Sequence, residues 1–273
     1  MGWLGRPASE TQITHARRLW LYGLAVVIMA FLVAPTVIVI PMSFSDSQYL
    51  EFPPQAWSVR WYENYFGSFE WMRATATSFK AGFLTMVVAT PLGTMAAYGL
   101  HASSLRLASL VFLVLVTPII VPVILVAIGV FYVYARIGMV NTLTGLVLAH
   151  AILAIPLVLV VVSSALKSYD MSQEMVARSL GASRFKAFML VTLPQIRFAV
   201  ITSALLAFLT SFDEVIIAMF VSGAENSTLT RNMFNALRDQ IDPTIASIST
   251  VMIVVSSALL AATQLMGRGT GGG

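Results

Sequence analysis

Two adjacent acidic residues stand inside a long apolar stretch, and they are the side chains in this sequence best placed to do chemistry. The tetrapeptide SFDE occupies residues 211–214, within an apolar run over 197–222. One carboxylate at bilayer depth costs roughly 2.5–3.5 kcal/mol, so Asp213 and Glu214 are expected to face water, a cation or a basic partner. Neighbours on a continuous helix point about 100° apart, so one acid is expected to line a pathway while the other pairs across helices. An inter-helix structural pair or a gate is the alternative, and Ser211 joins the two acids as a candidate pathway residue.

Other kinds of site find little support in the sequence. The chain has no Cys, which excludes disulfides and thiolate metal sites within it, and its three His residues are scattered. His150 lies in an apolar run, where we expect a hydrogen bond between helices rather than a proton relay. No G-x-x-x-x-G-K-[ST] phosphate loop and no catalytic triad or HExxH pattern occurs. We therefore expect a non-enzymatic chain that carries no cofactor or metal of its own.

The composition indicates an integral membrane protein. The 273 residues are 58% hydrophobic and 10% charged, whereas about 25% of the residues in soluble domains are charged. The mean hydropathy is +0.85. A net charge of +4 needs no nucleic-acid partner, because basic loops of a membrane protein produce it. We expect an all-α fold in contact with membrane lipid.

Six apolar runs are long enough to cross a membrane, since a span needs about 20 apolar residues. The first run is too long for a cleaved signal peptide and is expected to remain as a span. A short helix with a capping box at Ser9 and Gln12 is expected before it. The predicted organisation is a cytosolic N-terminal segment 1–18, a six-span domain 19–266 and a disordered tail 267–273. The predicted spans are 19–43, 78–100, 107–135, 142–166, 197–222 and 245–266.

The distribution of basic residues predicts the orientation. With both termini in the cytosol, the segments assigned to that side hold the majority of the 16 Lys and Arg residues, as the positive-inside rule requires. Two outer loops are long enough to have a role of their own. Loop 44–77 is rich in aromatic residues and fits either an interfacial belt or a docking surface for a binding protein. Loop 223–244, of mixed charge, fits either a solvated face or a docking surface.

The stretch 170–196 has the pattern of a helix, a sharp turn and a second short helix between two spans. Glycine tolerates the left-handed conformation that ends a helix, and Gly181 follows a helical run. Ser183 can then cap the second helix. Pro194 is expected to end that helix or to kink it into the next span. Apolar side chains are thereby presented among basic ones, which is typical of a surface that contacts another protein.

This stretch resembles the EAA loop of the permease subunits of binding-protein-dependent ABC importers. The resemblance is carried by Glu174–Ala177, by Gly181-Ala182-Ser183 and by Leu193-Pro194. Met175 and Val176 depart from the family pattern, which has small residues at these two positions. The resemblance extends from about Leu19 to Met266 and implies a type I ABC importer (MetI-like) permease fold.

The resemblance also implies how such a chain works. In the family this loop, here residues 167–196, forms a coupling helix that docks on an ATPase subunit. The implied partners are two ATP-binding subunits that hold ATP and Mg²⁺, a homologous second permease in a heterodimer, and a periplasmic solute-binding protein, all at the cell inner membrane. The implied coupling residues are Glu174, Ala177, Arg178, Gly181, Ala182, Phe185, Phe188 and Pro194.

The resemblance is strongest to the spermidine/putrescine permease group, on the second of its two permease types. It implies import of a small cationic solute such as a polyamine, for which a negative lining would offset the cost of desolvation. Import of γ-aminobutyrate, an opine or another amino-acid derivative is an alternative. A passive channel or an ion-coupled carrier using Asp213, Glu214 and His150 is an alternative of another class, and a membrane scaffold without a pathway is a third.

Overall fold

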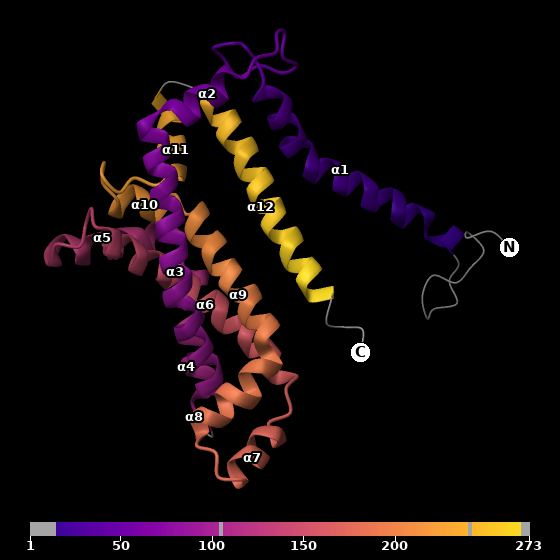
Figure 1. Ribbon diagram of the computed structural model, residues 1–273, viewed down its shortest axis with the longest axis vertical. Coiled ribbons are helices and arrows are strands. Elements are labelled where there is room, and N and C mark those ends of the chain that lie inside the picture. The colour runs from indigo at the N-terminus through magenta and orange to yellow at the C-terminus, as the bar shows by residue number, and fades with distance from the viewer. Residues whose placement is uncertain (1–14, 104–105, 240–241, 269–273) are drawn as a thin grey trace. The chain divides into compact units, whose positions relative to one another are not determined.

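A bundle of three long helices forms the core of the larger of the two units into which the chain divides. The computed structural model describes residues 15–103, 106–239 and 242–268, with side chains described up to residue 258. Within these ranges α3 (Phe69–His101), α6 (Leu143–Lys167) and α9 (Leu193–Asp213) pack against one another, as the ribbon shows (Figure 1). Buried Leu146, Leu159 and Leu166 lie on α6. The central helix is therefore enclosed by protein on most of its sides, as an apolar helix in the middle of a bundle should be.

Small residues on α3 allow its backbone to come close to its neighbours. The buried face of α3 carries mainly Ala, Gly, Ser and Thr. A Cβ added at Gly93 would lie 2.6 Å from the Cβ of Val158, and one added at Gly82 would lie 2.9 Å from the ring of Phe208. Helices in membranes associate through such close packing, because lipid is as apolar as a leucine side chain and no hydrophobic force drives them together.

The chain divides into two units, residues 1–67 with 240–260 and residues 68–239 with 261–273. The first unit contains a 3₁₀ turn (His15–Arg18), α1 (Leu19–Met42), α2 (Arg60–Gly67) and the start of α12 (Thr244–Arg268). In this unit Asn64 donates a hydrogen bond to Thr244 Oγ1 at 2.8 Å, and Ser247 donates to the carbonyl of Trp61 at 3.1 Å. These contacts join α2 to α12.

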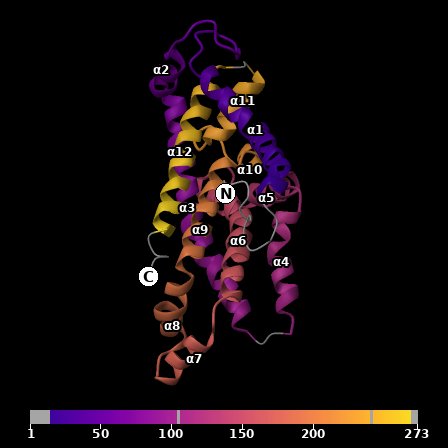
Figure 2. The ribbon, with the colours of Figure 1, turned by 90° about the vertical axis from the view of Figure 1, so that its right-hand side faces the viewer.

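The second unit places short helices at the two ends of its bundle. Helices α7 (Ser172–Ser179) and α8 (Arg184–Ala187) lie at one end, with a π-helical turn over Phe188–Thr192 that leads into α9. Helices α10 (Ile216–Val221) and α11 (Leu229–Asp239) lie at the other end (Figure 1 and Figure 2). The remaining helices of this unit are α4 (Ala108–Ile120) and α5 (Val123–Ile137).

The third predicted span, 107–135, is broken into two helices. Its two halves, α4 and α5, meet at an angle of 98°. Val121 between them is extended (φ −69°, ψ 134°) and precedes Pro122. The ring of a proline disfavours the helical conformation of the residue before it, and its nitrogen has no hydrogen to donate. The sequence TPIIVP therefore breaks the helix.

The fifth predicted span, 197–222, is also interrupted. Helix α9 ends at Asp213, Glu214 is extended (ψ 116°), and α10 begins at Ile216. Pro194 does not end the preceding helix, because the chain is helical from Arg184 to Asp213. The hydrogen bond from Leu193 N–H reaches back to the carbonyl of Phe188. A turn with this i→i+5 pattern precedes a proline that cannot donate to the usual carbonyl.

The other predicted spans coincide with single helices. By length and apolar composition, four described helices could cross a membrane, or five if the bent pair α4–α5 counts as one. The described side chains of α12 form a shorter apolar stretch, Thr244–Ala258. Each of the six predicted spans is thus matched by a helix or a broken helix. The predicted capping box at Ser9 and residues 269–273 of the predicted disordered tail 267–273 lie outside the described residues, whereas residues 267 and 268 are helical and end α12.

Adding a side chain at Gly93 is expected to push α3 and α6 apart, because the two helices are in close contact there. Gly93→Val should lower the free energy of unfolding by about 1–3 kcal/mol, as other overpacked cores do. The matched control is Gly99→Val on the same helix, because a Cβ at Gly99 meets nothing within 4 Å. Thermal unfolding of the purified protein in detergent measures the difference. Equal melting temperatures of the two variants would contradict this account of the contact.

Candidate functional site

Loop 167–196 folds as a helix, a left-handed turn and a second helix, as the sequence predicted. Gly181 has φ +94°, its N–H donates to the carbonyl of Arg178, and the next N–H, of Ala182, donates to the carbonyl of Ala177. This pair of bonds is the Schellman arrangement that closes a helix at a glycine. Ser183 Oγ then accepts a bond from Lys186 N–H at the start of α8. The predicted end of the first helix at Gly181 and the predicted start of the second helix at Ser183 are both confirmed.

The start of α7 is fixed by an acidic side chain. The carboxylate of Asp170 accepts hydrogen bonds from the backbone N–H of Ser172 at 2.9 Å and from its hydroxyl at 2.6 Å. These bonds favour the charged form and lower the pKa of Asp170 below its ordinary value. The first turn of α7 is therefore held by an anion, which also suits the positive end of the helix dipole.

The outer surface of this loop exposes both apolar and basic side chains. Leu180 and Phe185 are 84% and 71% exposed, and Met175 and Val176 are exposed as well. A shallow groove of about 540 Å³ runs between α7 and α8. Such large apolar side chains on a solvent-facing tip are typical of a surface that another protein covers. We name this surface the knob; its apolar members are Met175, Val176, Leu180 and Phe185, and its basic members are Arg178, Arg184 and Lys186.

The predicted coupling residues lie on different sides of the loop. Phe185 and Arg178 are on the knob, while Ala177 and Ala182 are half-buried. Phe188 turns inward, with its ring centroid 4.5 Å from that of Tyr98 on α3. Gly181 makes the turn, and Pro194 lies in the first turn of α9. Met175 and Val176, at the positions where small residues were expected, are exposed on the knob.

Glu174 points away from the knob and into the protein. It is 2% exposed. The hydroxyl of Tyr98 donates to its Oε1 and the hydroxyl of Thr192 donates to its Oε2, both at 2.6 Å. A carboxylate can be buried when its oxygens accept hydrogen bonds of this quality. Sequence reasoning missed Tyr98 and Thr192, because nothing in their spacing indicates that they meet Glu174.

The predicted pathway residues at the other end of α9 are separated by the end of the helix. Asp213 is the last helical residue and is exposed. Glu214 has left the helix, and its Oε1 accepts a bond from Ile217 N–H at 2.9 Å, which caps α10. The expectation that the two acids point about 100° apart on one helix is therefore wrong. Glu214 instead satisfies an N–H that the start of α10 would otherwise leave unpaired.

Ser211 lies inside the bundle rather than on its surface. It is 2% exposed and 2.7 Å from Nδ1 of His150 on α6, and its hydroxyl donates to Thr85 Oγ1 on α3 at 3.2 Å. Thr85 in turn donates to the carbonyl of Val147. Because the hydroxyl hydrogen of Ser211 is used in the bond to Thr85, Ser211 Oγ must accept the bond from His150. His150 therefore carries its hydrogen on Nδ1. The hydrogen bond between helices predicted for His150 is confirmed, and it joins all three core helices.

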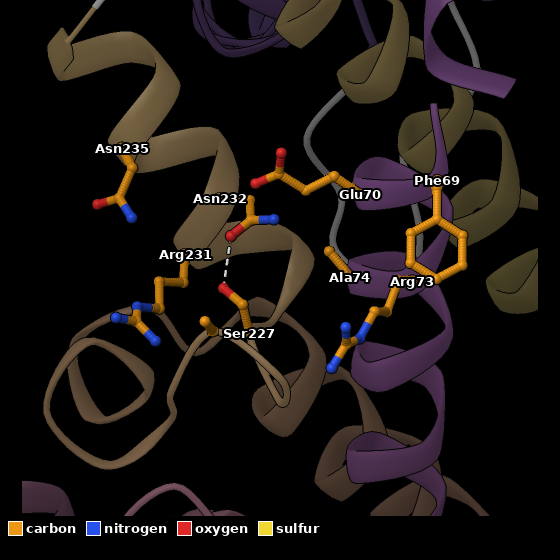
Figure 3. Close-up of a pocket in the computed structure, with 9 residues that line it drawn as sticks. Phe69, Glu70, Arg73, Ala74, Ser227, Arg231, Asn232 and Asn235 are labelled. Carbon is orange, nitrogen blue, oxygen red and sulfur yellow. Dashed lines mark hydrogen bonds between the residues drawn. The ribbon is translucent and has the colours of Figure 1, made fainter. Parts of the chain in front are cut away.

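The end of the unit opposite the knob carries a polar pocket of about 410 Å³ (Figure 3). The guanidinium of Arg73 donates to the carbonyl of Glu225, and that of Arg231 donates to the carbonyl and hydroxyl of Ser222. Burial lowers the pKa of Arg231 from its ordinary value. The pocket is formed by the start of α3 and by the segment from α10 to α11. It is lined by Phe69, Glu70, Arg73, Ala74, Ala224, Ser227, Arg231, Asn232 and Asn235.

Removing the hydroxyl of Ser211 is expected to destabilise the bundle. Ser211→Ala leaves Nδ1 of His150 buried without its partner, which costs about 1–3 kcal/mol of the free energy of unfolding. Ser203→Ala is the matched control, because Ser203 is equally buried on α9 and donates to the carbonyl of Val200 in its own helix. Unfolding in detergent compares the two. If Ser203→Ala costs as much as Ser211→Ala, the His150–Ser211 bond is not what stabilises the bundle.

Comparisons with known proteins agree on one family. The chain is 29% identical over 247 residues to the spermidine/putrescine transport system permease protein PotC of Haemophilus influenzae, covering 89% of this chain and 94% of that protein. It is 31% identical over 230 residues to the putrescine transport system permease protein PotI of Escherichia coli, covering 82% of each.

A solved structure shows the same fold. It is a bacterial alginate ABC transporter in complex with an alginate pentasaccharide-bound periplasmic protein. One of its chains matches with a TM-score of 0.71 at 16% identity, over 93% of this chain and 95% of that one. The family model for the binding-protein-dependent transport system inner membrane component matches residues 89–269. This chain therefore belongs to the family of inner membrane components of binding-protein-dependent transport systems.

Proposed function

We propose that this chain forms half of the translocation pathway of an ABC importer for a small polyamine, with spermidine and putrescine as the first candidates. A periplasmic binding protein delivers the solute, a homologous second permease forms the other half, and two ATPase subunits supply the energy. The chain itself is a non-catalytic permease subunit. The similarity to PotC and PotI supports the choice of solute.

The observation that carries the proposal is the knob. A channel or an ion-coupled carrier has no use for an exposed apolar surface on a loop that is built with a Schellman turn and two capped helices. Exposed apolar side chains interspersed with arginines suit a protein interface, in which Met, Phe and Arg are enriched. The ATPase subunits dock on the knob, which places loop 167–196 and both termini in the cytosol, as the basic residues also favour.

The end of α9 supplies a negative site for the cation. Backbone carbonyls at a helix C-terminus carry partial negative charge, and the carboxylate of Asp213 adds to it at the same point. Glu214 is engaged with α10 and contributes less. Such a site offsets the desolvation cost of a protonated amine that leaves water. The second permease supplies the other half of the pathway, facing this site. A negative end of α9 also fits a cationic solute better than γ-aminobutyrate or an opine, both of which carry carboxylates.

The polar pocket at the far end of α3 is a docking place for the binding protein. It lies opposite the knob, and therefore on the outside in the proposed orientation. Amide and charged side chains surround it. Interfaces that form and dissociate in each transport cycle are more polar than permanent ones. Loop 223–244 contributes Ala224, Ser227, Arg231, Asn232 and Asn235 to this pocket, and these residues are part of the docking surface.

Contact between the knob and the ATPase can be tested by cross-linking. Because the natural sequence lacks Cys, Leu180→Cys introduces a single thiol on the knob. A thiol-reactive cross-linker in membranes containing the whole importer should join this residue to the ATPase subunit. Ile124→Cys on α5, which is exposed but distant from the loop, is the matched control. Mass spectrometry identifies the product, and a knob thiol that captures no ATPase subunit would contradict the proposal.

Neutralising the two acids separately tests the pathway. Asp213→Asn should lower the uptake of spermidine or putrescine by roughly tenfold, since the loss of an ion pair near a protein surface is a matter of a few kcal/mol at most. Glu214→Gln should have a smaller effect, because its amide oxygen can still accept the Ile217 N–H bond. Uptake of labelled polyamine into proteoliposomes is the measurement. Unchanged uptake by Asp213→Asn, or equal losses in both variants, would remove Asp213 from the pathway.

A further inference from the structure

Two hydroxyl groups on other segments donate hydrogen bonds to the side chain of Glu174. Tyr98 lies near the end of α3, and Thr192 is the last residue of the π-helical turn that leads into α9. Both bonds are 2.6 Å long. Bonds to a carboxylate at this distance are among the stronger ones in proteins. One buried carboxylate therefore connects α7 to two of the three core helices.

The ring of Tyr98 also contacts the second half of the loop. Phe188 packs on it at 4.5 Å between ring centroids, and the guanidinium of Arg184 lies 5.5 Å from its centre. Arg184 Nη2 donates to the carbonyl of Ala102 at 3.2 Å, just beyond the end of α3. The hydroxyl of Tyr98 thus donates to Glu174 on α7 and accepts a bond from Arg184 Nε on α8 at 3.4 Å, while its ring contacts α8 and the π-helical turn. The side chain of Tyr98 therefore contacts both helical segments of the loop, α7 and the segment from α8 to the π-helical turn.

Besides the bonds of Glu174, the amide of Gln195 on α9 donates to Gln173 Oε1 on α7 at 3.3 Å. Helix α7 packs chiefly against α8 and the π-helical turn, which are parts of the same loop. Its outward face is the exposed knob. The bond between Tyr98 and Glu174 joins α7 directly to α3. A displacement of α7 therefore acts on α3 through this bond.

Helix α3 runs from this bond to the far end of the unit. It has 33 residues, with Pro91 in its interior, and at about 1.5 Å per residue it is about 50 Å long. Its first turns line the polar pocket through Phe69, Glu70 and Arg73. The same helix therefore touches the loop at one end and the pocket at the other.

We propose that Tyr98 is a positioning residue for energy coupling, and that its bond to Glu174 transmits movement of the knob to α3. Thr192 transmits the same movement to α9. This proposal rests on the proposed function, in which an ATPase subunit docks on the knob. The carboxylate of Glu174 acts inside the permease, through its bonds to Tyr98 and Thr192.

The test measures coupling in the complete importer. Tyr98→Phe keeps the ring that packs on Phe188 and removes the hydroxyl. In proteoliposomes with the binding protein and ATPase present, the number of polyamines imported per ATP hydrolysed should fall by about threefold or more, since the variant loses a bond to a charged group. ATP hydrolysis itself should persist. Tyr134→Phe, at a buried tyrosine of α5 outside this network, is the matched control and should leave the ratio unchanged.

A second pair of variants separates the bond from general stability. Thr192→Val should lower the ratio and Thr192→Ser should restore it, because serine keeps the donating hydroxyl. Unfolding temperatures in detergent are recorded for all variants. A normal ratio in Tyr98→Phe, or an equal loss in Tyr134→Phe, would overturn the proposal.

The cross-linking experiment distinguishes failure of this proposal from failure of the proposed function. If Leu180→Cys still joins the ATPase subunit while Tyr98→Phe transports with a normal ratio, the knob docks as proposed and only the role of Tyr98 is wrong. If Leu180→Cys joins no ATPase subunit, the docking itself is wrong, and the proposal for Tyr98 falls with it.

Discussion

The close contact of α3 with α6 and α9 is the constraint on which the rest of this permease depends. It exists because α3 buries small residues, so that its backbone approaches Val158 and Phe208 directly. Everything with a proposed role is attached to this contact. The bond from Tyr98 to Glu174 lies at one end of α3, and the polar pocket lies at the other end. The hydrogen-bonded residues His150, Ser211 and Thr85 join the three helices in the middle. Close packing on both sides of Pro91, at Gly82 and at Gly93, holds α3 against its neighbours, and in the proposed coupling such contacts carry the movement of α3 to α6 and α9.

The sequence predicted well the features that local rules control. The positions of the apolar helices follow from composition and length, and the turn at Gly181 with the cap at Ser183 follows from the backbone chemistry of two residues. The 98° bend was readable in principle, since a proline disfavours a helical residue before it at Val121. The apolar composition of the segment does not show the bend, because hydropathy measures apolar content and not the direction in which the chain runs.

Contacts between distant segments were out of reach. Tyr98 and Glu174 are 76 positions apart, and no periodicity relates them. Glu174 was expected to act at the ATPase surface because it stands in a recognisable motif, yet its carboxylate is turned inward. The end of α9 between Asp213 and Glu214 depends on a cap that Glu214 provides for a helix following it, which competes with continuation of α9. Such choices are made by tertiary context, and a single sequence does not display them.

The π-helical turn at Phe188–Thr192 has a consequence for how relatives of this chain could diverge. A π turn holds one residue more than the α-helical turn it replaces. Loss of that residue would restore an ordinary helix and rotate everything before it by about 100° about the axis of α9. The knob would then face a different direction with every one of its side chains unchanged. Recognition between a permease and its own ATPase can therefore be altered by a single deletion in this turn, as a change of register and without any change of surface chemistry.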